Sequence, residues 1–546
     1  MYKRIKRISE FFNKEQKNSL LSINPILIKK FDLFKKWLIE NGAIFTKNID
    51  FPYAYGPFNL IGCKCISEIK ENESILLIPK KLMIISKELT YLDKAMEYIK
   101  EKIYDDNDIP AIYLTLNLYL ENKKKNSFFR PYLDLIFSNY NFLNDFNEEN
   151  MKYFENNEKI IESINDFCED INELYNLINK SNYFNEMTKN EFFFCYSQVI
   201  SRQFYIDQKS TALIPLADLL NHSNINIHNE FYDSENYVFK YSTHFSEELD
   251  INIDLRPTFI KEYPLMSNNK IIIELSEPFN LKNEKKEINK KIIEINDNYY
   301  FSISTSKGEI IKKGNQAFNN YTNNGNKYLL KYYGFCLIDN KYDYTPIIIN
   351  IETGNDIYLH KYLDTIFGKI YKITDSFKKY LKIKIYFNEV CFYLIKYFRF
   401  LYFYKEKNDM KQYINYKFDI ELEISFISSS IEYLKLELNI LNNKTNVEKE
   451  LDVLEKELFN NEENKPNSFK INALIYNIKQ KINIINQIEI LEWLLSIMRK
   501  YKNKINSYIN LLDYENEFNN ITQCDTDENS KIKVINFIKK SKNIIG

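Results

Sequence analysis

Two adjacent polar residues, Asn221 and His222, end the apolar stretch ALIPLADLLNHS at 212–223. A side-chain amide both donates and accepts hydrogen bonds, and a neutral imidazole has one donor and one acceptor. Because polar groups inside a core are almost always hydrogen-bonded, this pair needs partners. The partners are either local backbone groups at a strand end or a bound ligand with donors and acceptors of its own, such as a zwitterion.

A second candidate is Arg202, which lies in SRQF at the end of a segment with helical spacing. Its planar guanidinium can pair with a carboxylate through two parallel hydrogen bonds. The alternative is an exposed arginine at a helix end, which is common on protein surfaces. Tyrosine is abundant, with 43 residues, so no tyrosine attracts attention by its type alone.

The seven cysteines are scattered along the chain, and only Cys63 and Cys65 lie close together. No second pair and no histidine cluster stands at a zinc-ligand spacing. We therefore expect reduced intracellular thiols and no metal site.

The chain has 546 residues, enough for two or three domains. Hydrophobic residues make up 45% and aromatic residues 16% of it, so globular cores are expected. Its 74 Lys and Arg nearly balance its 75 Asp and Glu. This balance argues against broad binding to a phosphate backbone, and we expect no direct nucleic acid partner.

No apolar run approaches the roughly 20 residues that a membrane-spanning helix needs, so we expect no membrane span. The first residues, MYKRIKRISEFFNKEQK, are basic but lack the apolar core of a secretory signal. We interpret 1–27 as a solvated helical arm, with a signal for import into an organelle as the alternative. The sequence thus predicts an intracellular protein, cytoplasmic or nuclear, with an organelle and the oligomeric state left open.

Hydrophobic periodicity predicts an α+β fold. FDLFKKWLIENG at 31–42 has helical spacing and ends at a glycine, residues 58–83 predict two or three strands, and 86–200 predicts helices. Beyond about 360 the pattern is almost wholly helical, starting with KYLKIKIYFNEVCFYLIKYFRFLYFY. Further strands are expected at 212–220, 270–275, 299–305 and 346–351. Two polar stretches, 236–297 and 441–470, are interpreted as surface loops.

Five segments occur in an order that resembles a known family: SFFRPYLDLI (127–136), SRQF (201–204), ALIPLADLLNHS (212–223), GNQAFNNYTNNGNKYLLKYYGF (314–335) and DNKYD (339–343). Together they resemble the SET-domain protein methyltransferases, in the branch typified by the Rubisco large-subunit lysine methyltransferase. The motifs cover about 28–350, and the helical tail matches in character only.

The resemblance implies a β-rich SET fold with a pseudoknot and a helical insert, followed by an all-α domain that docks a protein substrate. The implied parts are an arm at 1–27, SET segments at 28–85 and 201–350, the insert at 86–200, an elaboration at about 236–297, and the helical domain at 351–546.

The resemblance also implies a site for S-adenosyl-L-methionine. Backbone groups of Asn221 and His222 would meet the adenine, the Asn221 side chain would hold the amino-acid end, and Arg202 would pair with the carboxylate. Further residues at the cofactor would be Asn59, Leu60 and Ile61 in the first strand turn, and the aromatic pair Tyr333 and Phe335, whose faces suit a sulfonium.

Tyr321 is implied as the catalytic residue, with Tyr328, Tyr332 and Tyr333 as rivals. Methyl transfer from a sulfonium is an in-line displacement, so the enzyme aligns the groups and places charge. A lysine has a pKa near 10.4 and must lose its proton, which a nearby sulfonium and a dry channel favour. The hydroxyl of Tyr321 would orient the neutral amine.

Phe204 and Ala217 would line the acceptor channel. A small residue facing an aromatic one leaves a narrow apolar slot, which suits the methylene stem of a lysine better than an imidazole. The sequence therefore favours protein lysine over histidine as the methyl acceptor, and a histidine-directed enzyme is one alternative.

The chain also departs from the family pattern. Leu60 stands where a glycine usually permits close approach to the cofactor, and the usual preceding Glu is absent. Thr322 replaces a glycine after Tyr321, and the segment between His222 and Tyr321 is unusually long. These departures favour a second alternative, a catalytically silent SET-like module that binds a protein partner.

Overall fold

The chain folds into two compact units in a computed structural model. Unit 1 comprises Met1–Tyr153, Lys159–Asp339 and Lys456–Asn472; unit 2 comprises Phe154–Glu158, Asn340–Glu455 and Ala473–Gly546. The structure describes residues 1–16, 24–71, 73–86, 97, 99, 109–154, 157–181, 183–207, 210–225, 227–232, 238–242, 266–267, 270–275, 291–295, 300–306, 308–351, 363–364, 366–368, 371–373, 379–387, 390–407, 420–443, 445–459 and 466–505.

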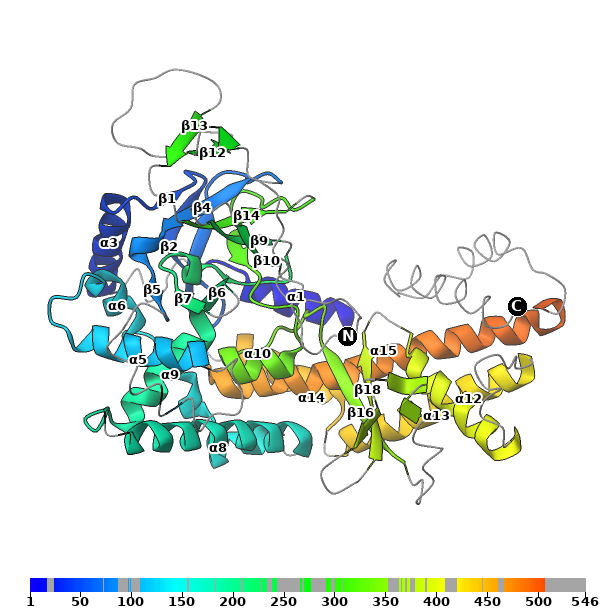
Figure 1. Cartoon of the computed structure of the whole chain (residues 1–546). Helices are drawn as coiled ribbons and strands as arrows, with labels where there is room; N and C mark the ends of the chain where they lie inside the picture. Colours follow the sequence, from blue (N-terminus) through cyan, green and yellow to red (C-terminus); the bar gives the residue numbers. More distant parts are fainter. Residues whose placement is uncertain are drawn as a thin grey trace. The chain divides into compact units, whose positions relative to one another are not determined.

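Unit 1 contains helices and short strands around one hydrophobic core. In Figure 1, helices α5, α8 and α9 lie together at one end of this unit, and β12 and β13 lie at the opposite end. Its described helices are α1 (Tyr2–Phe12), α3 (Pro25–Glu40), α5 (Ile109–Lys123), α6 (Arg130–Ile136), α7 (Glu148–Met151), α8 (Glu158–Lys180), α9 (Lys189–Arg202) and α10 (Asn326–Tyr333).

The strands of unit 1 form several small sheets. One has the order β1 (Ile44–Phe45), β4 (Ser74–Pro79), β14 (Tyr300–Thr305), β9 (Ile227–Tyr232) and β10 (Val238–Ser242). A second has the order β2 (Ile49–Tyr55), β3 (Leu60–Cys65), β15 (Gln316–Asn319) and β8 (Asn221–His222). Two smaller sheets have the orders β5 (Ile84–Ile85), β7 (Ser210–Leu213), β6 (Gln203–Asp207), and β11 (Met266–Ser267), β12 (Lys270–Leu275), β13 (Lys291–Ile295).

Helix α9 carries Arg202 at its last position. Thr188 caps its start, because the Thr188 hydroxyl accepts a hydrogen bond from the backbone N–H of Glu191 at 3.2 Å. The Glu191 carboxylate accepts in return from the Thr188 backbone N–H at 2.9 Å, which completes a capping box. Side chains of α9 such as Phe192 and Val199 are buried, and the helix packs against α5. Arg202 is therefore held at a well-anchored helix end.

Unit 2 has its own hydrophobic core. Its sheet has the order β16 (Tyr344–Asn350), β18 (Lys379–Tyr386) and β17 (Tyr371–Ile373). The remaining described helices of the chain are α12 (Phe392–Lys407), α13 (Ile420–Leu441), α14 (Val447–Phe459) and α15 (Ser468–Ile505). The expected α+β fold class is confirmed, and the expected strands at 270–275, 299–305 and 346–351 correspond to β12, β14 and β16.

The expectation of an all-helical C-terminal part is wrong for 379–386. This segment is strand β18, whose residues Tyr380–Tyr386 pair with β16. Leu381, Ile383 and Ile385 are buried, while the residues between them are partly exposed. That alternation is the period of a strand with one buried face. The helix expected here begins only at Phe392.

Three other expectations are corrected. Much of 441–470, interpreted as a loop, is helix α14, which buries Val447, Leu451, Leu454 and Leu458. The strand expected at 212–220 ends at Leu213, and Ala217–Leu219 form a 3-10 turn. The arm is helical at α1, as expected, but Ile8 is fully buried, so the helix is packed and not solvated.

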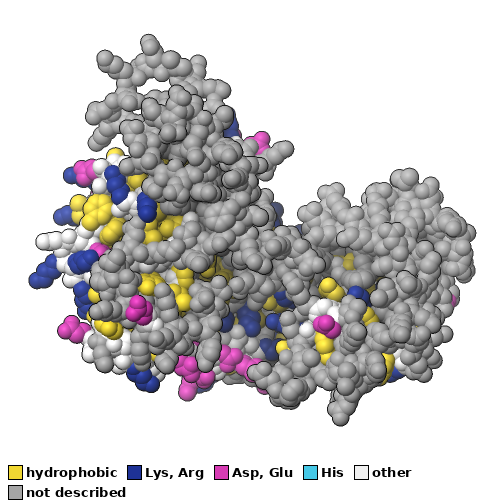
Figure 2. Space-filling view, in the orientation of Figure 1, with side chains coloured by type: hydrophobic (Ala, Val, Ile, Leu, Met, Phe, Trp, Pro, Cys, Tyr) yellow, Lys and Arg dark blue, Asp and Glu magenta, His cyan; other side chains and the backbone are white. Residues whose placement is uncertain are grey.

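The elaboration at 236–297 contains the described strands β10 to β13, and the rest of it lies outside the described residues. The division of the chain at 28, 86, 201 and 351 stays a prediction. On the face shown in Figure 2, basic and acidic side chains are both present on the described surface, in keeping with the near-zero net charge.

Candidate functional site

Strand β8, made of Asn221 and His222, lies beside the strand that leads to Tyr321. It pairs in parallel with β15, where Phe318 is opposite Asn221 and Asn319 is opposite His222. The backbone N–H of Ser223 continues the pairing by donating to the Asn319 carbonyl at 3.0 Å. The sheet therefore brings two motifs about a hundred residues apart in sequence into contact, as expected. That a loop is threaded here stays a prediction.

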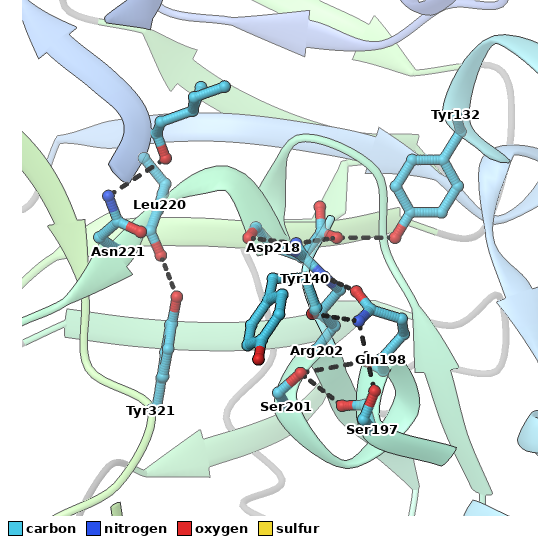
Figure 3. Close-up of polar contacts among 11 residues, drawn as sticks. Tyr132, Tyr140, Ser197, Gln198, Ser201, Arg202, Asp218, Leu220, Asn221 and Tyr321 are labelled. Atoms are coloured by element: carbon cyan, nitrogen blue, oxygen red, sulfur yellow. Dashed lines mark hydrogen bonds and ion pairs between the residues drawn. The ribbon is translucent and has the colours of Figure 1, made fainter. Parts of the chain in front are cut away.

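Tyr321 donates hydrogen bonds from both its backbone N–H and its side-chain hydroxyl. Its N–H donates to Nδ1 of His222 at 3.0 Å. Its hydroxyl donates to the Leu220 carbonyl at 3.0 Å, as Figure 3 shows. Its ring stacks on the His222 ring, with centroids 5.2 Å apart and planes at 29°. The phenol thus has a fixed orientation at the end of β8.

Four rings form what we call the aromatic cluster: His222, Tyr321, Tyr333 and Phe335. Tyr333 stacks on Tyr321 at 5.1 Å, and Phe335 lies 5.8 Å from His222 and 6.1 Å from Tyr333. Helix α10 ends at Gly334 with a φ of 75°, which a glycine adopts without strain, and this turn directs Phe335 back to the cluster. The cluster unites four of the residues predicted from the sequence.

Two of the three rival tyrosines, Tyr328 and Tyr332, pack against each other, whereas the third, Tyr333, belongs to the aromatic cluster. Tyr328 contacts Tyr332 at 4.4 Å, and Tyr332 packs against Phe167 of α8 at 5.2 Å. Neither has a described ring contact with His222, whereas Tyr321 does. The geometry therefore favours Tyr321 over Tyr328 and Tyr332.

His222 is buried, and its tautomer follows from its contacts. Because Nδ1 accepts the Tyr321 N–H, the ring proton lies on Nε2, which is buried without a hydrogen-bond partner. Burial lowers the pKa of His222 from its ordinary value to about 3. The imidazole is therefore neutral throughout the physiological range.

This burial predicts a pH-dependent stability. His222 binds a proton near pH 6.5 in the unfolded chain but only near pH 3 in the folded chain. Its contribution to the free energy of unfolding is therefore complete above pH 6.5 and decreases as the pH falls below that value. Between pH 7 and pH 4 this loss is about 3 kcal/mol. His222→Asn keeps an acceptor for the Tyr321 N–H and removes the titration. Denaturant unfolding at each pH should show a smaller acid loss for the variant; parallel profiles would contradict the assignment.

The turn before β3 approaches Asn221 closely. The Asn221 side-chain N–H donates to the Ile61 carbonyl at 3.2 Å. Asn59 has a φ of 54°, a left-handed conformation that asparagine tolerates, and Leu60 is 49% exposed. A tight approach between protein groups lies at Gly62 in β3, where a Cβ would be 2.7 Å from Nδ2 of Asn221 and still closer to Nε2 of Gln316. Whether Leu60 lies against the cofactor stays a prediction.

Gln316 is a residue that the sequence analysis missed. It is 4% exposed, and its Nε2 is buried without a hydrogen-bond partner. Its amide nitrogen and that of Asn221 both lie close to the position that a Cβ of Gly62 would occupy. The two side-chain amides therefore border the same small region beside β3. The sequence signal was weak, because a glutamine in a polar, Asn-rich segment has no distinctive spacing.

Replacing Gly62 with alanine should therefore disturb the site. The added methyl forces the amides of Asn221 and Gln316 apart, and overpacking of this kind costs about 1–3 kcal/mol. Thermal unfolding would measure the loss. An unchanged midpoint for Gly62→Ala would contradict the described packing.

Arg202 is held in a network of buried polar groups (Figure 3). Its Nε donates to the Gln198 side chain at 3.2 Å, and its Nη1 donates to the Asp218 carboxylate at 3.1 Å. The hydroxyl of Tyr132 donates to the same carboxylate oxygen at 2.8 Å. The Gln198 amide donates to the Tyr140 carbonyl at 3.2 Å. Gln198 and Tyr132 are further residues that the sequence analysis missed.

Charges in this network act on one another. Burial raises the pKa of Asp218 above its ordinary value, and the positive charge of Arg202 limits the rise. Burial also raises the pKa of Tyr321 well above its ordinary value, while Arg202 acts in the opposite direction. The Tyr321 hydroxyl therefore keeps its proton at neutral pH, and the Arg202 charge is close enough to influence it.

The two residues expected to line an acceptor channel are both buried. Phe204 lies on β6 and packs edge-on against Phe301 of β14 at 5.0 Å. Ala217 is fully buried at the start of the 3-10 turn, one residue before Asp218. Their shared role in a channel stays a prediction.

Within the described ranges, no group of His, Cys, Asp and Glu side chains has a metal-binding arrangement. Cys63 and Cys65 are buried, and burial raises the pKa of the Cys65 thiol to about 12. Among the described helices, none has the length and apolarity needed to cross a membrane.

Comparisons with known proteins give two kinds of relative. No protein-family model matches the chain. The actin-histidine N-methyltransferase of Xenopus tropicalis is 25% identical over 241 residues, which are 41% of this chain and 40% of that protein. The Homo sapiens protein of the same name is 24% identical over 241 residues, covering 41% and 39%. The chain thus spans about two fifths of the length of these relatives.

A solved structure is similar over most of the chain. The crystal structure of the SET domain of LSMT bound to lysine and AdoHcy has a TM-score of 0.52 and 17% sequence identity, covering 90% of this chain and 99% of that one. At this identity the comparison establishes a shared fold.

Proposed function

We propose that this chain, which has the SET-domain fold, is a protein methyltransferase that uses S-adenosyl-L-methionine. One observation carries the proposal: Asn221, His222 and Tyr321 meet at the end of β8. Arg202 is close enough for its charge to act on Tyr321. A scaffold has no physical need for this set of residues, whereas a site for a charged donor does.

The residues around β8 fit the cofactor. Arg202 would hold its carboxylate, and the partly exposed amide of Asn221 and the buried amide of Gln316 would meet its amino-acid end. Backbone at Asn59, Leu60, Ile61, Asn221 and His222 would surround the rest. Gly62 keeps that side of the site free of a Cβ, which supports the fit.

The bound cofactor supplies an electrophilic methyl group on a sulfonium. Tyr321 then has an orienting role. Its hydroxyl proton is used in the bond to the Leu220 carbonyl, so its oxygen lone pairs face away as hydrogen-bond acceptors for a neutral amine. Tyr333 and Phe335 would offer ring faces to the sulfonium, which would favour that charge.

We propose lysine as the acceptor residue. The supporting observation is the apolar, buried character of Phe204 and Ala217, which suits a methylene stem. The relatives of known name act on a histidine of actin, so a histidine acceptor is the second candidate. A protein substrate is common to both.

Unit 2 is proposed as the docking region for that substrate. The exposed apolar side chains Leu436 and Ile440, 63% and 62% exposed, lie one turn apart on α13 and support this role. Exposed apolar residues grouped in this way often mark protein contacts.

The test is an assay of methyl transfer from isotope-labelled S-adenosylmethionine to proteins of a cell extract, with Tyr321→Phe as the matched control. Acid hydrolysis and mass spectrometry of the labelled protein should yield methyllysine. Methylhistidine alone would overturn the lysine assignment. Cofactor binding without transfer to any residue would favour the silent module.

A further inference from the structure

Residues Lys14–Gln16, here called the edge segment, form an antiparallel β-bridge with the outer strand β2 of the sheet that carries the candidate site. The Gln16 N–H donates to the Ala54 carbonyl at 2.8 Å, and the Gly56 N–H donates to the Lys14 carbonyl at 3.0 Å. Glu15 lies opposite Tyr55 in an antiparallel bridge. Because β2 is the outer strand, the backbone groups at its end would otherwise be unpaired.

Side chains extend this attachment across β2. The Lys64 ammonium on β3 lies 2.5 Å from the Glu15 carboxylate, and the two side chains are only 24% and 25% exposed. The ring of Phe12 packs edge-on against Phe58, in the turn between β2 and β3, at 5.9 Å. The edge segment and the end of α1 are therefore fixed to both strands of the hairpin.

Helix α1 is itself anchored elsewhere in unit 1. The Ser9 hydroxyl donates to the Asp339 carboxylate at 2.7 Å. Phe11 packs against Phe459 at 4.9 Å, and the Arg7 guanidinium lies 4.3 Å from the centre of the Phe459 ring. With Ile8 fully buried, the helix provides a firm base from which the edge segment reaches the hairpin.

The hairpin turn held in this way leads directly to the candidate site. It contains two positive φ angles, 63° at Gly56 and 54° at Asn59. A Cβ at Gly56 would lie 2.7 Å from the Phe12 carbonyl oxygen, so the end of α1 packs directly on the turn. The next residues are Leu60 and Ile61, and the Ile61 carbonyl accepts the Asn221 bond.

We propose that residues 1–16 are a positioning element for the turn Asn59–Ile61 and thereby set the affinity for S-adenosylmethionine. The proposal rests on the proposed function of the site. A turn that is already ordered loses less conformational entropy when a ligand binds. Releasing the turn from α1 should therefore weaken cofactor binding by about tenfold. A tenfold change in Kd corresponds roughly to the conformational free-energy cost of ordering one residue.

The experiment uses the full chain and variants of the attachment. Gly56→Ala pushes α1 off the turn and also strains the turn itself, because Gly56 has a φ of 63°. Glu15→Gln removes the ion pair without this strain and with less risk to folding. The single charge reversals Glu15→Lys and Lys64→Glu should each weaken cofactor binding. The double variant Glu15→Lys/Lys64→Glu restores an ion pair with the charges exchanged, so its cofactor affinity should return toward wild type. Glu40→Gln is the matched control, because Glu40 pairs with Lys36 on the exposed face of α3, at 3.7 Å.

Two readouts separate the possible results. Amide hydrogen exchange at residues 60–62, measured without ligand, should be about tenfold faster in Gly56→Ala and unchanged in Glu40→Gln. Calorimetry should show an S-adenosylmethionine Kd about tenfold weaker in Gly56→Ala, with kcat at saturating cofactor within about twofold of wild type. If residues 1–16 only stabilised the fold as a whole, Gly56→Ala would lower kcat as well.

Unchanged exchange at 60–62 in both Gly56→Ala and Glu15→Gln overturns the inference, whatever the chain binds. Faster exchange with an unchanged Kd also overturns it. Wild type that binds no S-adenosylmethionine, while exchange responds as expected, contradicts the proposed function and with it the claim about affinity.

Discussion

Replacing Tyr321 with phenylalanine should lower kcat by about 10²–10³-fold, the usual effect of removing one positioned polar group from a reacting centre. The phenylalanine ring retains the stack on His222, and the backbone bond to its Nδ1 stays intact. The S-adenosylmethionine Kd should therefore remain within about twofold of wild type. Single-turnover methyl transfer and calorimetry measure the two quantities.

Tyr328→Phe is the control for this prediction. Tyr328 lies on α10 next to Tyr332 and Tyr333, outside the contact with His222 and Leu220. Its loss should leave kcat within about twofold. If Tyr328→Phe abolished transfer and Tyr321→Phe did not, the catalytic assignment would be wrong. Because the Tyr321 hydroxyl keeps its proton, the rate should show no step from this group at neutral pH.

Replacing Arg202 with alanine should have two separate effects. It leaves the Asp218 carboxylate, whose side chain is 4% exposed, without its cation, which costs about 3–5 kcal/mol of stability. It also removes the proposed partner of the cofactor carboxylate, which should weaken cofactor binding by about 10–100-fold. Denaturant unfolding and calorimetry measure these effects independently.

The double variant Arg202→Ala/Asp218→Asn separates the effect on stability from the effect on cofactor binding. The neutral amide can still accept the Tyr132 hydroxyl, so most of the lost stability should return. Cofactor affinity should stay low, because the guanidinium is still absent. A double variant that binds S-adenosylmethionine as well as wild type would show that Arg202 serves only as the counter-charge of Asp218.

The contact between β8 and Tyr321 could be predicted because its parts lie in distinctive motifs. ALIPLADLLNHS and FNNYTNN identified Asn221, His222 and Tyr321, and the structure brings them together. Arg202 was identified because SRQF resembles the family motif, and that resemblance implied its pairing with the cofactor carboxylate. For such residues the local sequence carries most of the information.

The supporting residues were not predictable in the same way. Gln198 and Tyr132 act through contacts to Arg202 and Asp218 that depend on tertiary packing, and neither has a distinctive neighbourhood. The α-carbon of Gly62 lies close to the side-chain amides of Asn221 and Gln316, a contact that the sequence analysis did not anticipate. Distances of this kind follow from the fold.

Strand β18 shows a different reason for error. The segment 379–386 alternates apolar and lysine or tyrosine residues, which is a strand pattern, but it runs into a long helical stretch. When hydrophobic periodicity is assessed over one long window, the helical spacing of the following residues outweighs the strand alternation of 379–386. A shorter window over KYLKIKIY would have favoured a strand. Helix α14 was missed because its charged residues obscured four leucine and valine positions at helical spacing.

The most direct test of the site is calorimetric titration of the wild-type chain and Asn221→Ala with S-adenosylmethionine. Asn221 is partly exposed, and its one described bond is to the Ile61 carbonyl, so its loss should leave the fold intact. We predict saturable binding by wild type and an affinity about 10–100-fold lower for the variant, the effect of losing hydrogen bonds to a charged group. No binding by wild type, or equal affinities for the two proteins, would contradict the assignment of the β8 end as the cofactor site.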